Sequence, residues 1–271
     1  MADFIIGDDN WDDFVRSSLH DSNLCGMIPR DYQRVPYGSM SHAPALGDAI
    51  EPIPMEEWPD RIADAERERS TLIDVWEYLD GIVLNQSQLS YCWAFSSVKG
   101  YSLTRSVMGL PFVHLSPSSV AAPVVGYKNS GWYIEDALKR MVEVGVATTT
   151  TVPALTTSKA DFKPGWKEEA AKYRVAPAGW LDVPARDFKM HGTMLLSRHP
   201  VVVGLNYWGH AVLDLWLRDM NHALRPTDPN RYGIEFLNSW GVSWGNKGRG
   251  VRTGTKKLAD SIYALSQSLV C

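Results

Sequence analysis

The residues best suited to chemistry surround Cys92, which follows a polar run and precedes the apolar segment 93–95. The apolar spacing over 92–108 predicts a buried helix, and Gly109 suits its end. A cysteine in the first turn of a helix lies at the positive end of the helix dipole, which favours the thiolate. Because the thiolate is the nucleophilic form, this position suits catalysis. A cysteine that only fills core space is the alternative, and this window alone does not decide between them.

Two later segments supply the partners that a cysteine nucleophile needs. His210 stands at the start of an expected strand, and Asn238 directly follows another. A Cys–His pair whose imidazole is oriented by a third side chain is the minimal arrangement of this kind. Asn238 can accept the ring N–H, and Trp240 can shield that bond from water. Gln86 can donate its side-chain amide to a developing oxyanion, with the backbone N–H of Cys92 as second donor.

The elements that position these residues change type along the chain. A second helix is expected over 131–144, with Ser130 as its cap and Gly145 at its end, and Ser116-Pro117 marks another helix start. Strands are expected over 200–205, 211–217 and 232–237, followed by a glycine-rich loop over 241–250. Helices gather in the first half and strands in the second. This order indicates an α+β protein with two lobes and a cleft between them.

Residues 1–55 differ in composition from the rest and are expected to form an N-terminal, Pro-rich arm. Acidic residues dominate the first 21 positions, and turn-forming residues follow. One short helix is expected near 10–19, with Trp11, Phe14, Val15 and Leu19 on one face. The arm is either a tail lying on the surface or a segment that covers a cleft or docks a partner. Residues 56–271 are expected to form one domain, with a helical lobe at about 80–180 and a β lobe at about 181–260.

Composition excludes several function classes. With 27 Lys and Arg against 31 Asp and Glu, the net charge of −4 removes the main attraction to a nucleic-acid backbone. Three cysteines cannot build a disulfide framework in 271 residues, and Cys25 and Cys271 are expected to be ordinary thiols. Neither a secretory signal nor a membrane span is recognisable, so a cytoplasmic protein is expected, with a place in a virion or other assembly as the alternative. No cofactor and no metal are expected, since nucleotide motifs and metal-ligand spacings are lacking.

The segments around these residues resemble those of papain-like cysteine peptidases. The run 85–97 is similar to the family's active-site segment, in which Asn-Gln precedes Cys-Trp-Ala-Phe-Ser. Residues 209–212 resemble the family's histidine block and residues 238–250 its asparagine block, in the family's order. The resemblance implies the papain-like two-lobe α+β fold, with a helical N-terminal lobe, an antiparallel β-barrel-like C-terminal lobe and the active-site cleft between them.

The same resemblance implies a cysteine-type peptidase that hydrolyses peptide bonds through a thioester intermediate. In it Cys92 is the nucleophile, His210 the general base and then acid, Asn238 the orienting residue and Gln86 the oxyanion donor. An extended substrate would lie along a backbone ledge at 130–131, with Trp244 below its primed side. The expected catalytic residues are Cys92, His210, Asn238 and Gln86, and the expected substrate-binding residues are Gly131, Ser130, Trp244, Trp240 and Tyr91.

The sequence also departs from the family pattern. Leu89 and Lys128 stand where the family commonly has two disulfide-bonded cysteines, Tyr91 replaces a small residue, and Ser130 replaces the first glycine of the ledge. The arm does not resemble the longer helical propeptide of secreted members. Three functions therefore stay open. The first is a peptidase acting on peptides or proteins. The second is a papain-fold component of an assembly such as a phage particle or bacterial shell, in which the arm docks the protein, and the third is a hydrolase of another amide, such as a peptidoglycan cross-link.

Overall fold

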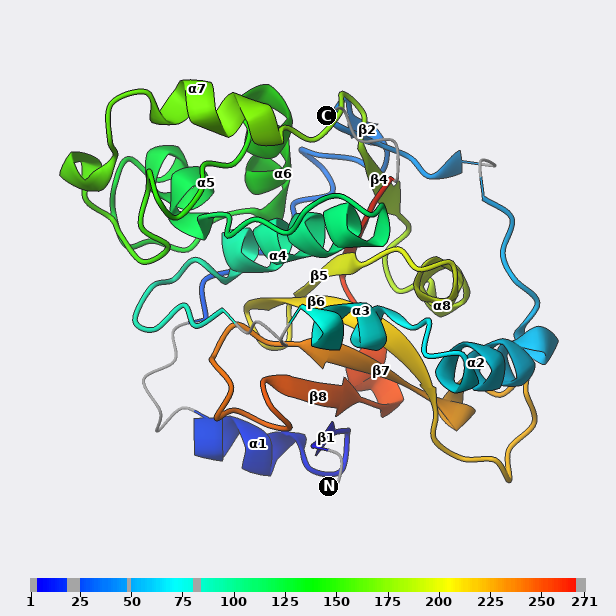
Figure 1. The fold of residues 1–271 in the computed structure, drawn as a ribbon. Helices are drawn as coiled ribbons and strands as arrows, with labels where there is room; N and C mark the ends of the chain where they lie inside the picture. Colours follow the sequence, from blue (N-terminus) through cyan, green and yellow to red (C-terminus); the bar gives the residue numbers. More distant parts are fainter. Residues whose placement is uncertain (1–3, 19–24, 48–49, 80–83, 267–271) are drawn as a thin grey trace.

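The computed structural model describes residues 4–18, 25–47, 50–79 and 84–266. Figure 1 shows a helical lobe above a sheet, and the central helix α4 (Cys92–Val107) lies between them. The other helices of this lobe are α5 (Pro117–Val124), α6 (Ile134–Glu143) and the short α7 (Trp166–Ala170). The expected α+β layout of two lobes is confirmed. Among the described residues, no helix is both long enough and apolar enough to cross a bilayer.

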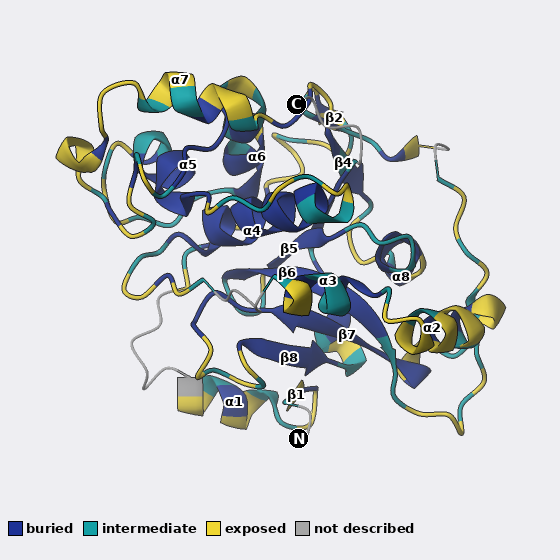
Figure 2. Cartoon of the chain, in the orientation of Figure 1, coloured by how far each residue is buried: buried dark blue, intermediate teal, exposed yellow. Residues whose placement is uncertain are grey.

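Helix α4 is buried along almost its whole length, as Figure 2 shows. Small and hydroxylated side chains let neighbouring elements approach it closely. The hydroxyls of Ser96, Ser97 and Thr104 each donate to a backbone carbonyl one turn earlier in the helix. These internal bonds satisfy polar groups that would otherwise cost free energy in the core. The sequence prediction of a buried helix over 92–108 is confirmed to within one residue.

The starts of α5 and α6 differ from each other. Ser116 caps α5 by accepting the N–H of Ser119, and Pro117 occupies the first position, as expected. The expected cap of α6 at Ser130 is wrong, because the helix begins at Ile134 and its N-terminal flank is Tyr133, which makes no side-chain cap bond. Residues 131–132 are instead extended and pair with another part of the chain.

The sheet has seven strands in the order β1-β8-β7-β6-β5-β9-β4. Their bounds are β1 (Ile5–Ile6), β4 (Trp180–Val183), β5 (Val201–Leu205), β6 (His210–Asp219), β7 (Tyr232–Leu237), β8 (Arg249–Arg252) and β9 (Ser261–Leu265). All neighbours are antiparallel except β1 and β8. Strand β6 packs directly against α4, which brings the start of β6 to the start of the helix. The helices α2 (Trp58–Arg67), α3 (Leu72–Tyr78) and α8 (Phe188–Leu196) also pack against β6.

The N-terminal residues lie along the molecule rather than apart from it. Strand β1 adds to the edge of the sheet, and α1 (Trp11–Ser18) follows it along the lower side in Figure 1. This helix falls within the range 10–19 expected for it. Farther on, β2 (Ser39–Met40) and β3 (Ala43–Pro44) form a two-stranded hairpin. The division of the chain at residue 55 stays a prediction.

A buried ion pair fastens the middle of this N-terminal region. Both terminal nitrogens of Arg30 donate to the carboxylate of Asp182 on β4, each at 2.8 Å. The Arg30 guanidinium also donates to the hydroxyl of Tyr263 at 3.1 Å and to two backbone carbonyls of the arm. Because both charged groups are buried, removing either one would leave the other without its partner.

Candidate active site

Cys92 occupies the first position of α4 and is completely buried. Burial raises the pKa of its thiol to about 11, although backbone N–H groups of Ala211, Gly26, Trp93 and Met27 act in the opposite direction. These groups come from β6, from the arm and from α4 itself. The helix-dipole argument predicted a lowered pKa; in this covered state the prediction is wrong, because desolvation outweighs the helix start.

His210 and Asn238 form a hydrogen-bonded pair beside this thiol. The Nε2 of His210 lies 2.8 Å from Oδ1 of Asn238, and the same oxygen accepts the backbone N–H of Ser239 at 2.7 Å. An Oδ1 that accepts fixes the proton on Nε2, so Nδ1 carries the lone pair. No hydrogen-bond partner of Nδ1 is found among the described residues, and this atom is buried. Nδ1 is therefore the ring atom available to take a proton.

Burial also controls the charge of the imidazole. It lowers the pKa of His210 to about 4, while the hydrogen bond to Asn238 acts in the opposite direction. Because the pKa of the thiol is raised and that of the imidazole is lowered, both groups are neutral at pH 7. Both shifts have one cause, the exclusion of water from the site.

Two indoles contact the imidazole. The ring centroid of His210 lies 4.9 Å from that of Trp240 and 4.8 Å from that of Trp208. The two indoles are 5.4 Å apart and nearly perpendicular, so the imidazole sits in the corner between them. Trp240 was expected beside the His–Asn bond, but Trp208 was missed. Its position two residues before His210, in a short turn, was the only signal in the sequence.

Gln86 lies in the loop that leads to Cys92 and is tied to the asparagine segment. Its backbone N–H donates to the carbonyl of Ser239 at 2.7 Å, and its side-chain oxygen accepts the Ser239 hydroxyl. Its side-chain nitrogen donates to the carbonyl of Leu89 at 2.7 Å. The structure thus brings Gln86 to the site, and its role as oxyanion donor stays a prediction.

The expected substrate ledge is occupied by the arm. The backbone N–H of Trp132 donates to the carbonyl of Gly26 at 2.8 Å, and the N–H of Ile28 donates to the carbonyl of Trp132 at 2.9 Å. Met27, between these two arm residues, donates its N–H to the carbonyl of Gly209 at 3.1 Å. Residues 26–28 therefore run parallel to 131–132, joined to them by an isolated bridge at Met27, and the backbone N–H groups of Gly26 and Met27 reach Cys92.

The contact between arm and ledge is tight. A Cβ atom on Gly131 would lie 2.5 Å from the carbonyl oxygen of Gly26, and a Cβ on Gly26 would lie 2.1 Å from that of Ser90. Only glycines allow the two backbones to approach in this way. Ser130, the other expected ledge residue, donates its hydroxyl to the carbonyl of Gly131 at 3.1 Å.

Helix α1 covers an aromatic surface next to the histidine. Phe14 packs against Trp208 at 5.1 Å, and Phe4 packs against Trp244 at 5.0 Å. Trp244 also contacts Trp240 at 5.9 Å. The expected floor of the primed side is thus covered by the first residues of the arm. The arm lies over this surface and over the ledge together.

Tyr91 and the remaining cysteines have separate positions. Tyr91 is completely buried; its hydroxyl donates to the carbonyl of Lys128 at 2.7 Å, and burial raises its pKa to about 12. A role in substrate binding stays a prediction for it. Cys25 is exposed, whereas Cys271 lies outside the described residues.

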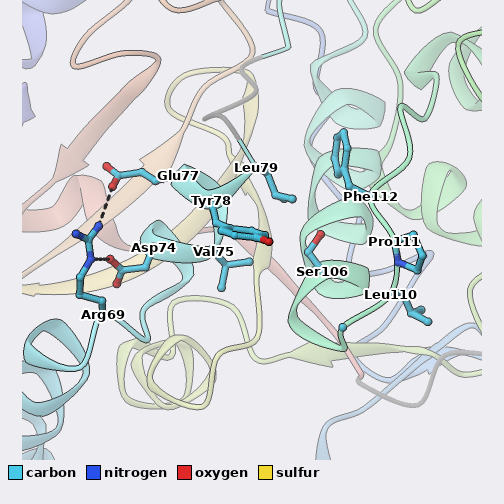
Figure 3. Close-up of a pocket in the computed structure, with 11 residues that line it drawn as sticks. Arg69, Asp74, Val75, Glu77, Tyr78, Leu79, Ser106, Leu110, Pro111 and Phe112 are labelled. Atoms are coloured by element: carbon cyan, nitrogen blue, oxygen red, sulfur yellow. Dashed lines mark hydrogen bonds and ion pairs between the residues drawn. The ribbon is translucent and has the colours of Figure 1, made fainter.

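A hollow also lies away from this site. A depression of about 980 Å³ lies between α3 and the end of α4 (Figure 3). Asp74, Tyr78, Leu110 and Phe112 are among its lining residues, and none of the expected site residues lines it. Arg69 forms ion pairs with Asp74 and Glu77 on its rim.

Solved structures with the same fold are papain-like cysteine proteases. The chain is similar to digestive procathepsin L 3 of Tenebrio molitor, with a TM-score of 0.55, 16% identity and coverage of 68% of this chain and 66% of that one. It is similar to xylellain, a cysteine protease from Xylella fastidiosa, with a TM-score of 0.54, 18% identity and coverage of 68% and 82%. A structure from a study of the mite allergens Blo t 1 and Der p 1 matches with a TM-score of 0.57, 16% identity and coverage of 94% and 90%.

These likenesses establish that the chain has the papain-like fold. The match spans slightly under two thirds of the length of the procathepsin chains, at 66% and 64%. No protein-family model matches the sequence, and no curated protein sequence matches it.

Proposed function

We propose that this protein is a papain-like cysteine peptidase whose N-terminal arm keeps its active site covered. The observation that carries the proposal is the arrangement at the start of α4. There the backbone N–H of Ala211 bonds to Cys92. The residue before it, His210, bonds to Asn238 through Nε2, and its Nδ1 has no hydrogen-bond partner among the described residues. A nucleophile, a base and a residue that orients the base are the three parts of the mechanism.

In the proposed reaction, Nδ1 of His210 takes the proton of the Cys92 thiol, and the thiolate attacks the carbonyl carbon of a peptide bond. The backbone N–H of Cys92 and the side-chain amide of Gln86 stabilise the oxyanion. The imidazolium then gives its proton to the leaving amine, and a thioester remains on Cys92. Water, deprotonated by His210, attacks the thioester and releases the acid.

This chemistry requires that the arm leaves. Residues 26–28 occupy the backbone ledge, and the thiol and imidazole beneath them are neutral because water is excluded. Water entering the site would remove the desolvation that keeps both groups neutral. The helix start and the imidazolium would then favour the thiolate, and the thiolate would favour the imidazolium. We therefore propose that the covered form is latent.

The proposed substrates are peptides or proteins, by analogy with the proteases that share the fold. An assembly partner docked through the arm stays a prediction. Several apolar side chains of the described arm residues are buried against the rest of this chain and do not offer a surface to a partner. They are those of Phe14, Met27, Met40 and Leu46.

The test is the mass of the protein after treatment with a thiol-directed epoxide. We expect one adduct on Cys92 in the Gly26→Ala chain, which cannot hold the arm in its present path, and none after the further change Cys92→Ser. Deleting residues 1–50 is less suitable, because it would remove Arg30 and leave Asp182 buried without its partner. An adduct of equal yield in both proteins would show that Cys92 is not the nucleophile.

A further inference from the structure

We propose that Trp208 is a positioning residue that stabilises the protonated form of His210; this inference rests on the proposed peptidase function. The centroids of His210, Trp208 and Trp240 form a nearly equilateral triangle with sides of 4.8, 4.9 and 5.4 Å. Trp208 thus contacts the imidazole as closely as Trp240 does.

The imidazole needs such a contact because it has few others. Its hydrogen bond to Asn238 holds Nε2, and no hydrogen bond holds Nδ1 among the described residues. One hydrogen bond leaves the ring free to tilt about the bonded atom. Packing against two indoles that are nearly perpendicular to each other restricts this tilt and holds Nδ1 in one direction.

The second effect of Trp208 is electrostatic. A cation within about 6 Å of an indole centroid is attracted by the negative face of the ring. The imidazolium that forms when His210 takes a proton satisfies this distance for both tryptophans. Trp208 therefore favours the charged form of His210 over the neutral form once the arm has left and water has returned.

The turn that carries Trp208 is well anchored. The N–H of Trp208 donates to the carbonyl of Leu205 at 3.0 Å, and the hydroxyl of Tyr207 donates to the carbonyl of Lys256 at 2.6 Å. Trp208 also packs on Phe236 at 6.1 Å in the sheet. These contacts do not involve α1, so the indole has support that is independent of the arm.

Among the described residues, few charged or titratable groups lie near His210. The backbone N–H of Ala211, the residue after His210, bonds to Cys92 of α4, and Cys25 of the arm lies near Cys92. Lys99 of α4 lines a small cavity shared with Asn238, and Lys256 lies over the rings of Trp11 and Tyr207. These groups are unchanged by a substitution at Trp208, so a shift in the pKa of His210 would report the indole itself.

The experiment measures the rate at which iodoacetate modifies Cys92, as a function of pH, in the full-length Gly26→Ala chain. Because this reagent is an anion, its rate falls when the imidazolium loses its proton, and the midpoint of this alkaline fall reports the pKa of His210. We expect Trp208→Leu to move the midpoint down by about half a pH unit or more. Trp208→Phe keeps an aromatic ring, and we expect a smaller shift.

Trp11→Ala in the same background is the matched control. Trp11 packs on Trp208 with a centroid distance of 6.0 Å and belongs to α1, so its loss loosens the arm without changing the second indole beside His210. We expect an unchanged midpoint. If Trp208→Leu also leaves the midpoint unchanged, the inference about Trp208 is wrong and the proposed function stands. If the Gly26→Ala parent shows no alkaline fall at all, no thiolate–imidazolium pair forms, and both are wrong.

Discussion

Replacing Gly26 with alanine should expose Cys92 without altering any residue of the peptidase site. The new Cβ would lie 2.1 Å from the backbone carbonyl oxygen of Ser90, far closer than a Cβ can approach an oxygen. Because the Ser90 carbonyl is held by the indole N–H of Trp93 at 3.0 Å, we expect the arm to be the part that moves, and to leave the ledge. The substitution also leaves the arm's ion pair between Arg30 and Asp182 in place.

The expected size of the effect follows from the bonds that hold residues 26–28. Three backbone hydrogen bonds, from Trp132 to Gly26, from Ile28 to Trp132 and from Met27 to Gly209, would be lost together. At about 1 kcal/mol each, they amount to about 3 kcal/mol in favour of the covered state. A change of this size corresponds to roughly a hundredfold increase in the open fraction.

The assay is the rate of Cys92 modification by iodoacetamide at pH 7, followed by the mass of the peptide that contains it. Gly47→Ala is the control, since this arm glycine has no atom within 4 Å of an added Cβ and only the backbone cost of its positive φ of 58° applies. We expect roughly a hundredfold faster modification in Gly26→Ala and little change in Gly47→Ala. Equal rates in Gly26→Ala and the unchanged protein, with circular dichroism unaltered, would refute the idea that the arm limits access.

Two further predictions concern stability. Arg30→Met should lower the free energy of unfolding by about 3–5 kcal/mol, because the buried carboxylate of Asp182 loses its partner. Arg61→Met, which breaks an exposed ion pair, should change it by less than about 1 kcal/mol. Equal urea midpoints for the two variants would contradict this. The lowered pKa of His210, about 4 against an ordinary 6.5, means that the unfolded chain binds the extra proton first. The free energy of unfolding should therefore fall as the pH drops from about 6.5 to about 4, by up to about 3 kcal/mol from this residue. His210→Gln should make the free energy of unfolding depend less on pH in this window. Urea titrations that give the same pH dependence for both proteins would exclude the effect.

The sequence was most informative where each element carries its own pattern. The apolar and small residues of 92–107 and the glycine after them predicted α4, and the apolar runs at 201–205 and 232–237 predicted β5 and β7. Strands β4 and β9 were not identified. In β9 only Ile262 is β-branched, whereas β5 begins with three valines, so β9 lacks the residue preference that marked β5 as a strand.

The path of the arm could not be predicted for a different reason. Residues 26–28 have no periodicity of their own, and their conformation depends on acceptors and donors at Trp132 and Gly209, far away in the sequence. The pKa of Cys92 depends on the same path. A helix start lowers the pKa of a thiol, but the arm excludes water, and its position decides which effect dominates. The contact of Trp208 with His210 likewise depends on the exact turn between β5 and β6.

The central claim is that Cys92 attacks peptide bonds with His210 as its base. The most direct measurement is the hydrolysis of an unfolded protein substrate by full-length Gly26→Ala, compared with the same chain carrying Cys92→Ser. The account predicts that Gly26→Ala cleaves the substrate, that the unchanged protein cleaves it much more slowly, and that the Cys92→Ser chain does not cleave it. Cleavage at the same rate with and without Cys92, or no cleavage by a Gly26→Ala protein whose Cys92 iodoacetamide modifies rapidly, would contradict it.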